Sequence, residues 1–144
     1  YIDIVKQQIK IAYHNKLEIK QKDVKFIGHA IEFRINAEDY TKNFMPVPGK
    51  INLYLPSDGM GVRTDSFVYP DYQIPTHYDS LLGKLIVWGR DREEAILRSK
   101  RALEEFIIDG VTTTIPFHQR ILNEEKFLKG DISTNYINDL LKDE

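Results

Sequence analysis

Residues 28–39, GHAIEFRINAED, carry the clearest periodic pattern in the chain. Within this stretch two sets of residues alternate, His29, Ile31, Phe33 and Ile35 in one set and Ala30, Glu32, Arg34 and Asn36 in the other. Successive side chains of a β-strand point to opposite faces, so this period of two predicts a strand. Glu32, Arg34 and Asn36 are therefore expected to project from the same face.

The segments around this strand predict further elements. Before it, four apolar residues at helical spacing predict a helix over residues 2–13: Ile2, Val5, Ile9 and Ala12. After it, residues 50–55 and 62–68 have the composition of strands, and the six residues between them, PSDGMG, favour a hairpin connection. Residues 82–88 predict a buried strand.

The C-terminal half is predicted to be mainly helical. Asp91 can cap a helix, and Glu94, three positions later, would complete a capping box. The apolar face of that helix would consist of Ala95, Ile96, Ala102, Leu103 and Phe106. Pro116 is expected to open a short helix, and residues 123–141 to form one or two more, divided at Gly130. The fold class predicted is α+β, a small antiparallel β-sheet with helices packed on it.

Length and composition limit the possible functions. The 144 residues, 42% hydrophobic and 29% charged, suffice for one domain with its own core. The net charge of -2 comes from interleaved acidic and basic residues, which predicts neither a nucleic-acid nor a membrane partner. Cysteine is absent and no apolar run could span a bilayer, so we expect a cytoplasmic protein. Because Tyr1 leads straight into an amphipathic pattern, we expect a piece of a longer chain.

Glu32 and Arg34 are the pair with the clearest chemical potential. A guanidinium held by a neighbouring carboxylate is a preorganised donor, which can stabilise an anion that develops during a reaction. The alternative is an exposed ion pair on a sheet face, worth only about 0–1 kcal/mol. Periodicity alone favours this second interpretation.

Common motifs for nucleotides and metals are missing. Gly83-Lys84 lacks the earlier glycine of a P-loop, and Gly59 with Gly61 fits a turn better than a dinucleotide fingerprint. The four histidines are widely spaced, so no metal site is predicted. Residues 77–79, His-Tyr-Asp, are the one cluster that offers a proton-transfer pair as an alternative.

Five segments, taken together, resemble a known family. Residues 28–39 are followed by FMPVPGKI, GVR, YDSLLGKL and IIDGV at residues 44–51, 61–63, 78–85 and 107–111. In this order and spacing they resemble the biotin carboxylase C-terminal domain, over essentially the whole chain. The resemblance implies the fold of that domain.

The resemblance also implies a function for the longer protein. Biotin carboxylases are ATP-grasp enzymes that use ATP, Mg²⁺ and bicarbonate to carboxylate biotin on a biotin carboxyl carrier protein, the first half-reaction of acetyl-CoA carboxylase in fatty acid synthesis. The implied partners are that carrier protein, carboxyltransferase subunits and a second copy in a homodimer. Residues 1–25 would be the end of the ATP-grasp core and residues 26–144 the C-terminal domain. Most ligands for ATP and Mg²⁺ would lie upstream, so the isolated fragment is expected to be inactive.

Individual residues acquire expected roles in the same way. Arg34 matches the arginine that steadies the negative ureido oxygen of biotin, and it is the expected catalytic residue. Asp79 is an expected cofactor-binding residue near the active-site face, with a loop-capping carboxylate as the alternative. Thr134 is a second expected cofactor-binding residue, in a piece that closes over the adenine of the nucleotide. Met60 and Arg63 are expected at the homodimer interface, with a solvent-facing arginine as the alternative.

Two other functions remain open on this resemblance. One is a non-catalytic module that supplies the dimer surface and docks the carrier. The other is the equivalent part of pyruvate carboxylase or another biotin-dependent carboxylase. The chain departs from the family pattern at Phe33, where cysteine is frequent, and at Tyr40, Met60 and Thr76-His77. These departures affect the loop and interface assignments more than they affect Arg34.

Overall fold

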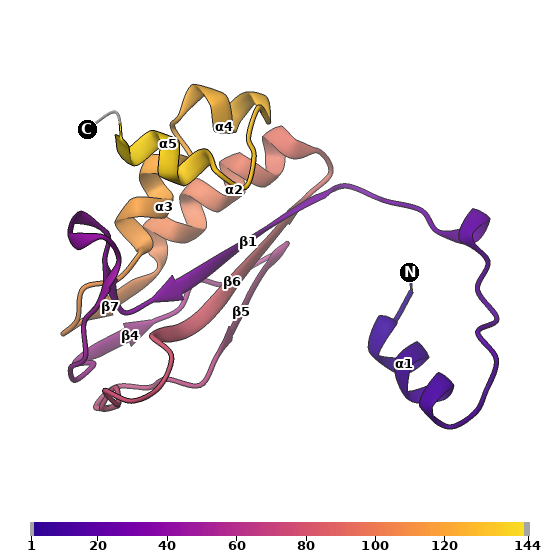
Figure 1. The fold of residues 1–144 in the computed structure, drawn as a ribbon, viewed down its shortest axis with the longest axis horizontal. Helices are drawn as coiled ribbons and strands as arrows, with labels where there is room; N and C mark the ends of the chain where they lie inside the picture. Colours follow the sequence, from indigo (N-terminus) through magenta and orange to yellow (C-terminus); the bar gives the residue numbers. More distant parts are fainter. Residues whose placement is uncertain (1, 143–144) are drawn as a thin grey trace.

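The computed structural model describes residues 2–142 and confirms the α+β class (Figure 1). The helices are α1 (Ile4–Ala12), α2 (Arg92–Glu105), α3 (Ile115–Ile121), α4 (Glu125–Lys129) and α5 (Tyr136–Lys142), with short 3₁₀ helices η1 (Gln21–Asp23) and η2 (Tyr40–Lys42). The strands are β1 (His29–Asn36), β2 (Glu38–Asp39), β3 (Met45–Pro46), β4 (Leu53–Leu55), β5 (Val62–Ser66), β6 (Leu81–Gly89) and β7 (Ile107–Asp109).

The central sheet is antiparallel and has the strand order β1-β6-β5 (Figure 1). Phe33 and Ile35 of β1 are buried in the core that the sheet forms with α2, whereas Glu32 and Arg34 are exposed on the other face. The alternation predicted for this strand is confirmed. It places Arg34 on the side of the sheet that α2 leaves uncovered.

The hairpin predicted between residues 50–55 and 62–68 is wrong. β4 pairs with β7, while β5 pairs with β6, so the two strands belong to different sheets. Pro56, directly after β4, has no N–H to donate to a ladder. Gly61 then turns the chain with φ +74°, and its carbonyl accepts a hydrogen bond of 2.8 Å from the backbone N–H of Trp88 on β6.

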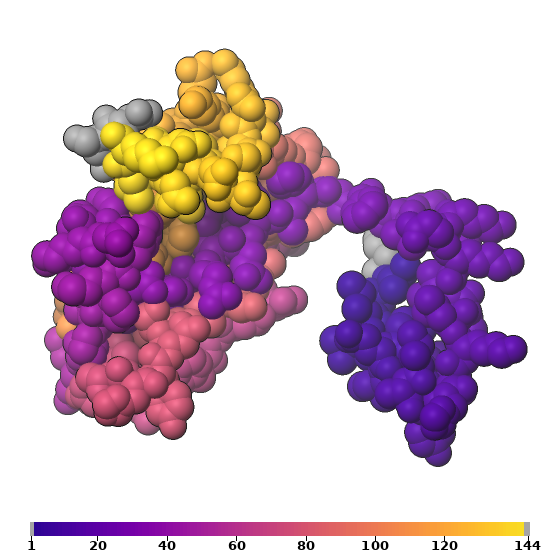
Figure 2. Space-filling model, in the orientation of Figure 1, coloured from indigo at the N-terminus to yellow at the C-terminus, as the bar shows by residue number. Residues whose placement is uncertain are grey.

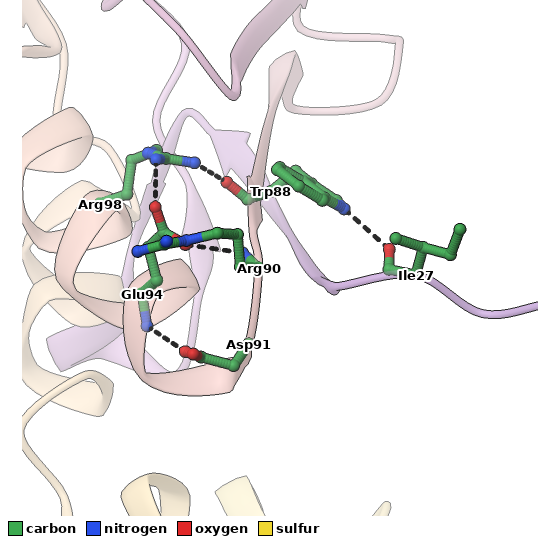
Figure 3. Close-up of polar contacts among 6 residues, drawn as sticks. All are labelled: Ile27, Trp88, Arg90, Asp91, Glu94 and Arg98. Carbon is green, nitrogen blue, oxygen red and sulfur yellow. Dashed lines mark hydrogen bonds and ion pairs between the residues drawn. The ribbon is translucent and has the colours of Figure 1, made fainter.

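The start of α2 is anchored to the end of β6 (Figure 3). Asp91 caps the helix as predicted, with its Oδ1 accepting from the N–H of Glu94 at 2.9 Å. The capping box is not the predicted one, because Glu94 Oε2 accepts from the backbone N–H of Arg90 at 2.7 Å. This backbone bond, reinforced by the Arg90 side chain, lowers the pKa of Glu94. Arg98 donates to Glu94 at 2.7 Å and to the carbonyl of Trp88, which completes the junction.

Two groups of buried side chains form the core. The five residues predicted for the apolar face of α2 are all buried between this helix and its neighbours: Ala95, Ile96, Ala102, Leu103 and Phe106. A second group lies under the loops: Ala37, Ile51, Val68, Ile74 and Leu82. Tyr54 and Ile108, which face each other across β4 and β7, pack against both groups. The two-stranded sheet of β4 and β7 therefore joins the two groups of core residues.

The C-terminal helices follow the prediction closely. α3 begins at Ile115, one residue before Pro116. The tail forms two helices, and Gly130 ends α4 in the left-handed conformation with φ +76°. α3 packs against α2, and α4 and α5 lie on the side of the molecule away from the β4–β7 pair (Figure 1).

The N-terminal helix stands apart from the rest of the chain (Figures 1 and 2). α1 confirms the predicted helix, but none of its residues is buried, and its apolar residues Ile4, Val5 and Ile9 are largely exposed. Near the start of β1, the indole N–H of Trp88 donates to the carbonyl of Ile27 at 3.0 Å (Figure 3). None of the helices within residues 2–142 is both long enough and apolar enough to cross a membrane.

Candidate active site around Arg34

Charged side chains cover the outer face of the central sheet. Arg34 lies opposite Lys84 on β6, and Lys84 lies opposite Asp65 on β5. Glu32 pairs with Lys84 at 3.7 Å, and Arg63 pairs with Asp65 at 3.1 Å. Glu32 was expected to hold Arg34, and the structure corrects this. Glu32 pairs instead with Lys84 on the neighbouring strand, which the sequence of β1 alone does not reveal.

The carboxylate that faces Arg34 belongs to Asp79. Its Oδ2 lies 3.9 Å from Nη2 of Arg34, while its Oδ1 accepts from the N–H of Leu81 at 2.9 Å. Asp79 therefore caps the turn before β6, as in the alternative drawn from the sequence, and also faces Arg34, while its role at an active site stays a prediction. The two side chains are 55% and 69% exposed, and such a pair contributes only about 0–1 kcal/mol. The guanidinium is thus accessible from outside the domain.

The backbone of Arg34 is held by side chains far along the sequence. The carbonyl of Arg34 accepts from Thr114 Oγ1 at 3.0 Å and from His118 Nε2 at 2.9 Å. Thr114 Oγ1 also accepts from the N–H of Asn36 at 3.0 Å, and its own N–H donates to the carbonyl of Asn36 at 3.0 Å. The segment that leads into α3 therefore closes the free edge of β1 at Arg34.

His118 serves this contact as a neutral ring. Burial lowers the pKa of His118, and its hydrogen bond to the carbonyl of Arg34 opposes that effect more weakly. The ring also packs edge-on against Phe33, with centroids 5.4 Å apart. Since a carbonyl only accepts, the contact requires the proton on Nε2. Sequence reasoning missed Thr114 and His118, because nothing in their local pattern points to a residue more than 75 positions away.

A polar network fixes the end of β1 beside Asp79. Asn36 Nδ2 donates to Glu38 Oε1 at 2.9 Å and to Ser80 Oγ at 3.3 Å, and the Ser80 hydroxyl donates to Glu38. The N–H of Ala37 donates to the carbonyl of Ser80 at 2.8 Å. These bonds hold the turn that carries Asp79 against the strand that carries Arg34.

Two pockets lie near residues with expected roles. One, of about 420 Å³, opens beside Asp79 and is lined by Phe67, Tyr72, Ile74, Pro75, Tyr78, Asp79, Leu81 and Leu82. The other, of about 500 Å³, lies between α4 and α5 and includes Ile132 and Ser133 in its lining. Thr134 is exposed and follows these two residues directly, but it is not part of that lining.

The two residues expected at a dimer interface are accessible. Met60 is 90% exposed, in the loop before β5. Arg63 is also exposed on β5, where it pairs with Asp65. Among residues 2–142, no three histidine or acidic side chains are grouped so that they could hold a metal ion.

Comparison with known proteins places this site in a family. The model of the biotin carboxylase C-terminal domain matches residues 32–139, which include Arg34, Asp79, Thr114 and His118. The chain belongs to the biotin carboxylase C-terminal domain family. The strand, the turn and the helix that build the site are thus parts of one known domain.

Relatives and solved structures agree with this assignment. The chain is 54% identical over 135 residues to biotin carboxylase 1 of Bacillus subtilis. This alignment covers 94% of this chain and 30% of that protein. It is 53% identical over 138 residues to a pyruvate carboxylase subunit of Methanothermobacter thermautotrophicus, which covers 96% of this chain and 28% of that protein. The chain thus spans less than a third of the length of either relative.

Among solved structures, the domain is similar to the biotin carboxylase domain dimer of the Hydrogenobacter thermophilus 2-oxoglutarate carboxylase. The TM-score is 0.90 at 43% identity, over 96% of this chain and 30% of that one. That protein is described in complex with MgADP, ADP and bicarbonate. The fold of this C-terminal domain therefore closely matches the corresponding part of that solved structure.

Proposed function

We propose that this domain forms one wall of a biotin carboxylase active site, in which Arg34 stabilises the negative ureido oxygen of biotin. The observation that carries the proposal is the placement of Arg34. Its backbone is held by Thr114 and His118, while its guanidinium is exposed on the open face of the sheet. A donor fixed before the reaction begins is what electrostatic stabilisation of an oxyanion requires.

The proposed reaction requires few other contributions from this domain. When a ureido nitrogen of biotin loses its proton to a base supplied by the rest of the protein, negative charge develops on the ureido oxygen. Arg34 would donate to that oxygen, and the nitrogen could then attack carbon dioxide. On the resemblance to the family, we propose that most ligands for the metal and for the phosphates of ATP lie in the longer protein. Residues 1–25 are then proposed to be the end of its ATP-grasp core.

Substitution of Arg34 in the full-length enzyme tests the proposal. Arg34→Ala should lower kcat for biotin carboxylation by about 10²–10³-fold, the usual effect of removing one oxyanion donor. Arg34→Lys should recover only part of the loss, because an ammonium lacks the planar fork of a guanidinium. Arg101→Ala is the matched control, since Arg101 pairs with Glu105 on α2, away from this face. Wild-type turnover in Arg34→Ala would refute the role.

The remaining expectations from the sequence stay predictions. The similar identities to a biotin carboxylase and to a pyruvate carboxylase subunit favour neither parent enzyme. We therefore propose carboxylation of carrier-bound biotin for the longer protein and leave the second half-reaction open. A homodimer through Met60 and Arg63 is supported by the exposure of Met60 and by the dimer formed by a solved relative. The roles of Thr134 and the carboxyltransferase partners are proposed on the resemblance alone, and the cytoplasmic location on the composition of the chain alone.

A further inference from the structure

The pocket beside Asp79, called here the arm pocket, adjoins Arg34 through this residue. Asp79 belongs to both features, since one oxygen of its carboxylate faces Arg34 and its side chain lines the pocket. Leu81 and Leu82, at the start of β6, contribute to the pocket wall. A ligand that contacts Arg34 with one end can therefore continue directly into the pocket.

The wall of the arm pocket is mainly apolar and aromatic. Phe67 and Tyr72 meet edge to face with ring centroids 5.6 Å apart, and Ile74 is buried at the base. Tyr78 stands at the rim and is 81% exposed. Asp79 is the only charged residue in the lining. This composition suits an apolar chain and disfavours an anionic group.

The loop that carries these aromatic residues is held in place. The N–H of Ile51 donates to the carbonyl of Tyr72 at 2.9 Å, and the N–H of Ile74 donates to the carbonyl of Gly49 at 2.9 Å. Lys50 and Asp71 form an ion pair of 2.6 Å across the same junction. The pocket is therefore formed before a ligand arrives, which reduces the cost of ordering on binding.

We propose that the arm pocket binds the aliphatic arm that links the ring system of biotin to the lysine of its carrier. The inference rests on the proposed function, because Arg34 must hold the ureido end. From that end the substrate continues as an apolar ring and an alkyl chain, and the tether to the carrier ends in a neutral amide. Free biotin instead ends in a carboxylate, which Asp79 would repel. The pocket volume of about 420 Å³ lies in the range of pockets that enclose small organic ligands.

The test uses the full-length enzyme and a series of biotin N-alkylamides, from methyl to pentyl, with free biotin for comparison. In the wild type, kcat/KM should rise by about two- to fourfold for each methylene that enters the pocket. Phe67→Ser and Tyr78→Ser should flatten this dependence on chain length. Tyr69→Ser is the matched control, because Tyr69 and Phe67 are both 59% exposed and both rings meet Tyr72, but only Phe67 lines the pocket.

The ratio of kcat/KM between the longest and the shortest amide separates the outcomes. If Phe67→Ser and Tyr78→Ser lose activity equally toward all amides, the ratio is unchanged and the inference is overturned. The inference is also overturned if kcat/KM of the wild-type enzyme does not depend on chain length. A pocket filled by another part of the protein would give that same indifference. Arg34→Ala, in contrast, should lower kcat for every member alike. Wild-type turnover in Arg34→Ala would refute the proposed function even if the chain-length dependence were present.

Discussion

At the scale of single residues, the position of Arg34 depends more on its backbone than on its ion pair. The pair with Asp79 spans 3.9 Å between exposed groups and contributes little. The carbonyl of Arg34, however, accepts from Thr114 and His118, which satisfy the outer edge of β1. An edge strand without such cover presents unpaired backbone groups to water and to other chains. Contacts at the edge of the sheet therefore hold the backbone of Arg34 in place.

Thr114 is the residue whose loss should disturb this arrangement most directly. Thr114→Val keeps the shape of the side chain but removes the hydroxyl between the N–H of Asn36 and the carbonyl of Arg34. We expect a loss of about 1–3 kcal/mol in the free energy of unfolding, because two backbone groups lose a partner. Thr114→Ser keeps the hydroxyl and should lose much less. Urea unfolding of the two variants measures this, and equal stability of Thr114→Val and the wild type would contradict it.

His118 should make part of the stability depend on pH. Its pKa in the folded protein is lowered from 6.5, so below that pH the unfolded chain binds the proton more readily. Well above pH 6.5 the ring is neutral in both states and its ionisation contributes nothing. As the pH falls from 6.5 toward the lowered pKa, the free energy of unfolding should decrease.

The substitution His118→Gln isolates this contribution. Glutamine does not titrate but retains an N–H that can reach the carbonyl of Arg34. Urea unfolding at several pH values between 7.5 and 5 should therefore show the stability advantage of the wild type shrinking as the pH falls. His77→Gln, at an exposed position, serves as the control. A difference between wild type and His118→Gln that stays constant with pH would show that the ring is not the titrating group.

For single residues, the sequence predicted only those features that a local pattern encodes. The period of two in residues 29–36 put Arg34 on the exposed face, which the structure confirms. The partner of Arg34 was misassigned to Glu32, because cross-strand neighbours cannot be seen in one strand alone. Thr114 and His118 lie 80 and 84 positions from Arg34, and only the packing of α3 against β1 brings them there. Long-range contacts of this kind have no periodic signature.

At the scale of elements, the structure shows how a correct strand prediction can carry a wrong pairing. The segments 50–55 and 62–68 both contain strands, and the glycines between them mark a turn. β4 nevertheless pairs with β7, in residues 107–109, after the whole of α2 has intervened. That pairing buries Tyr54 and Ile108 against both parts of the core, a gain that a β4–β5 hairpin would lack. Burial across the molecule therefore overrode the local turn signal.

Gly61 is the position in this connection that should tolerate no side chain. A Cβ there would lie 2.7 Å from the carbonyl oxygen of Trp88, at φ +74°. We expect Gly61→Ala to lower the free energy of unfolding by about 2–3 kcal/mol, combining left-handed strain with a backbone clash. Gly130→Ala has nearly the same φ, +76°, but its nearest atom is 3.7 Å away, so only about 1 kcal/mol should be lost. Thermal unfolding distinguishes the two, and equal losses would mean that the contact with Trp88 relaxes without cost.

At the scale of the whole molecule, the site is open on one side. α2 covers the inner face of the sheet, whereas the outer face with Arg34, Lys84 and Asp65 is exposed (Figure 1). The arm pocket shares Asp79 with this site. An oxyanion is stabilised best where water is excluded, so the proposed chemistry requires another domain to close this face. This arrangement agrees with the proposed boundary near residue 25 between the ATP-grasp core and the C-terminal domain.

α1 should contribute nothing to the folding of the residues that follow η1. No residue of α1 is buried, and an isolated helix of nine residues is marginal in water. Removing residues 1–25 should therefore change the free energy of unfolding by less than about 0.5 kcal/mol, as measured by urea unfolding. Ile9→Asp should be equally silent in the 144-residue chain but destabilising in the full-length enzyme, where we propose that the apolar face of α1 packs on the ATP-grasp core. If the deletion lowers stability by about 1 kcal/mol or more, α1 belongs to this domain and the proposed boundary is wrong.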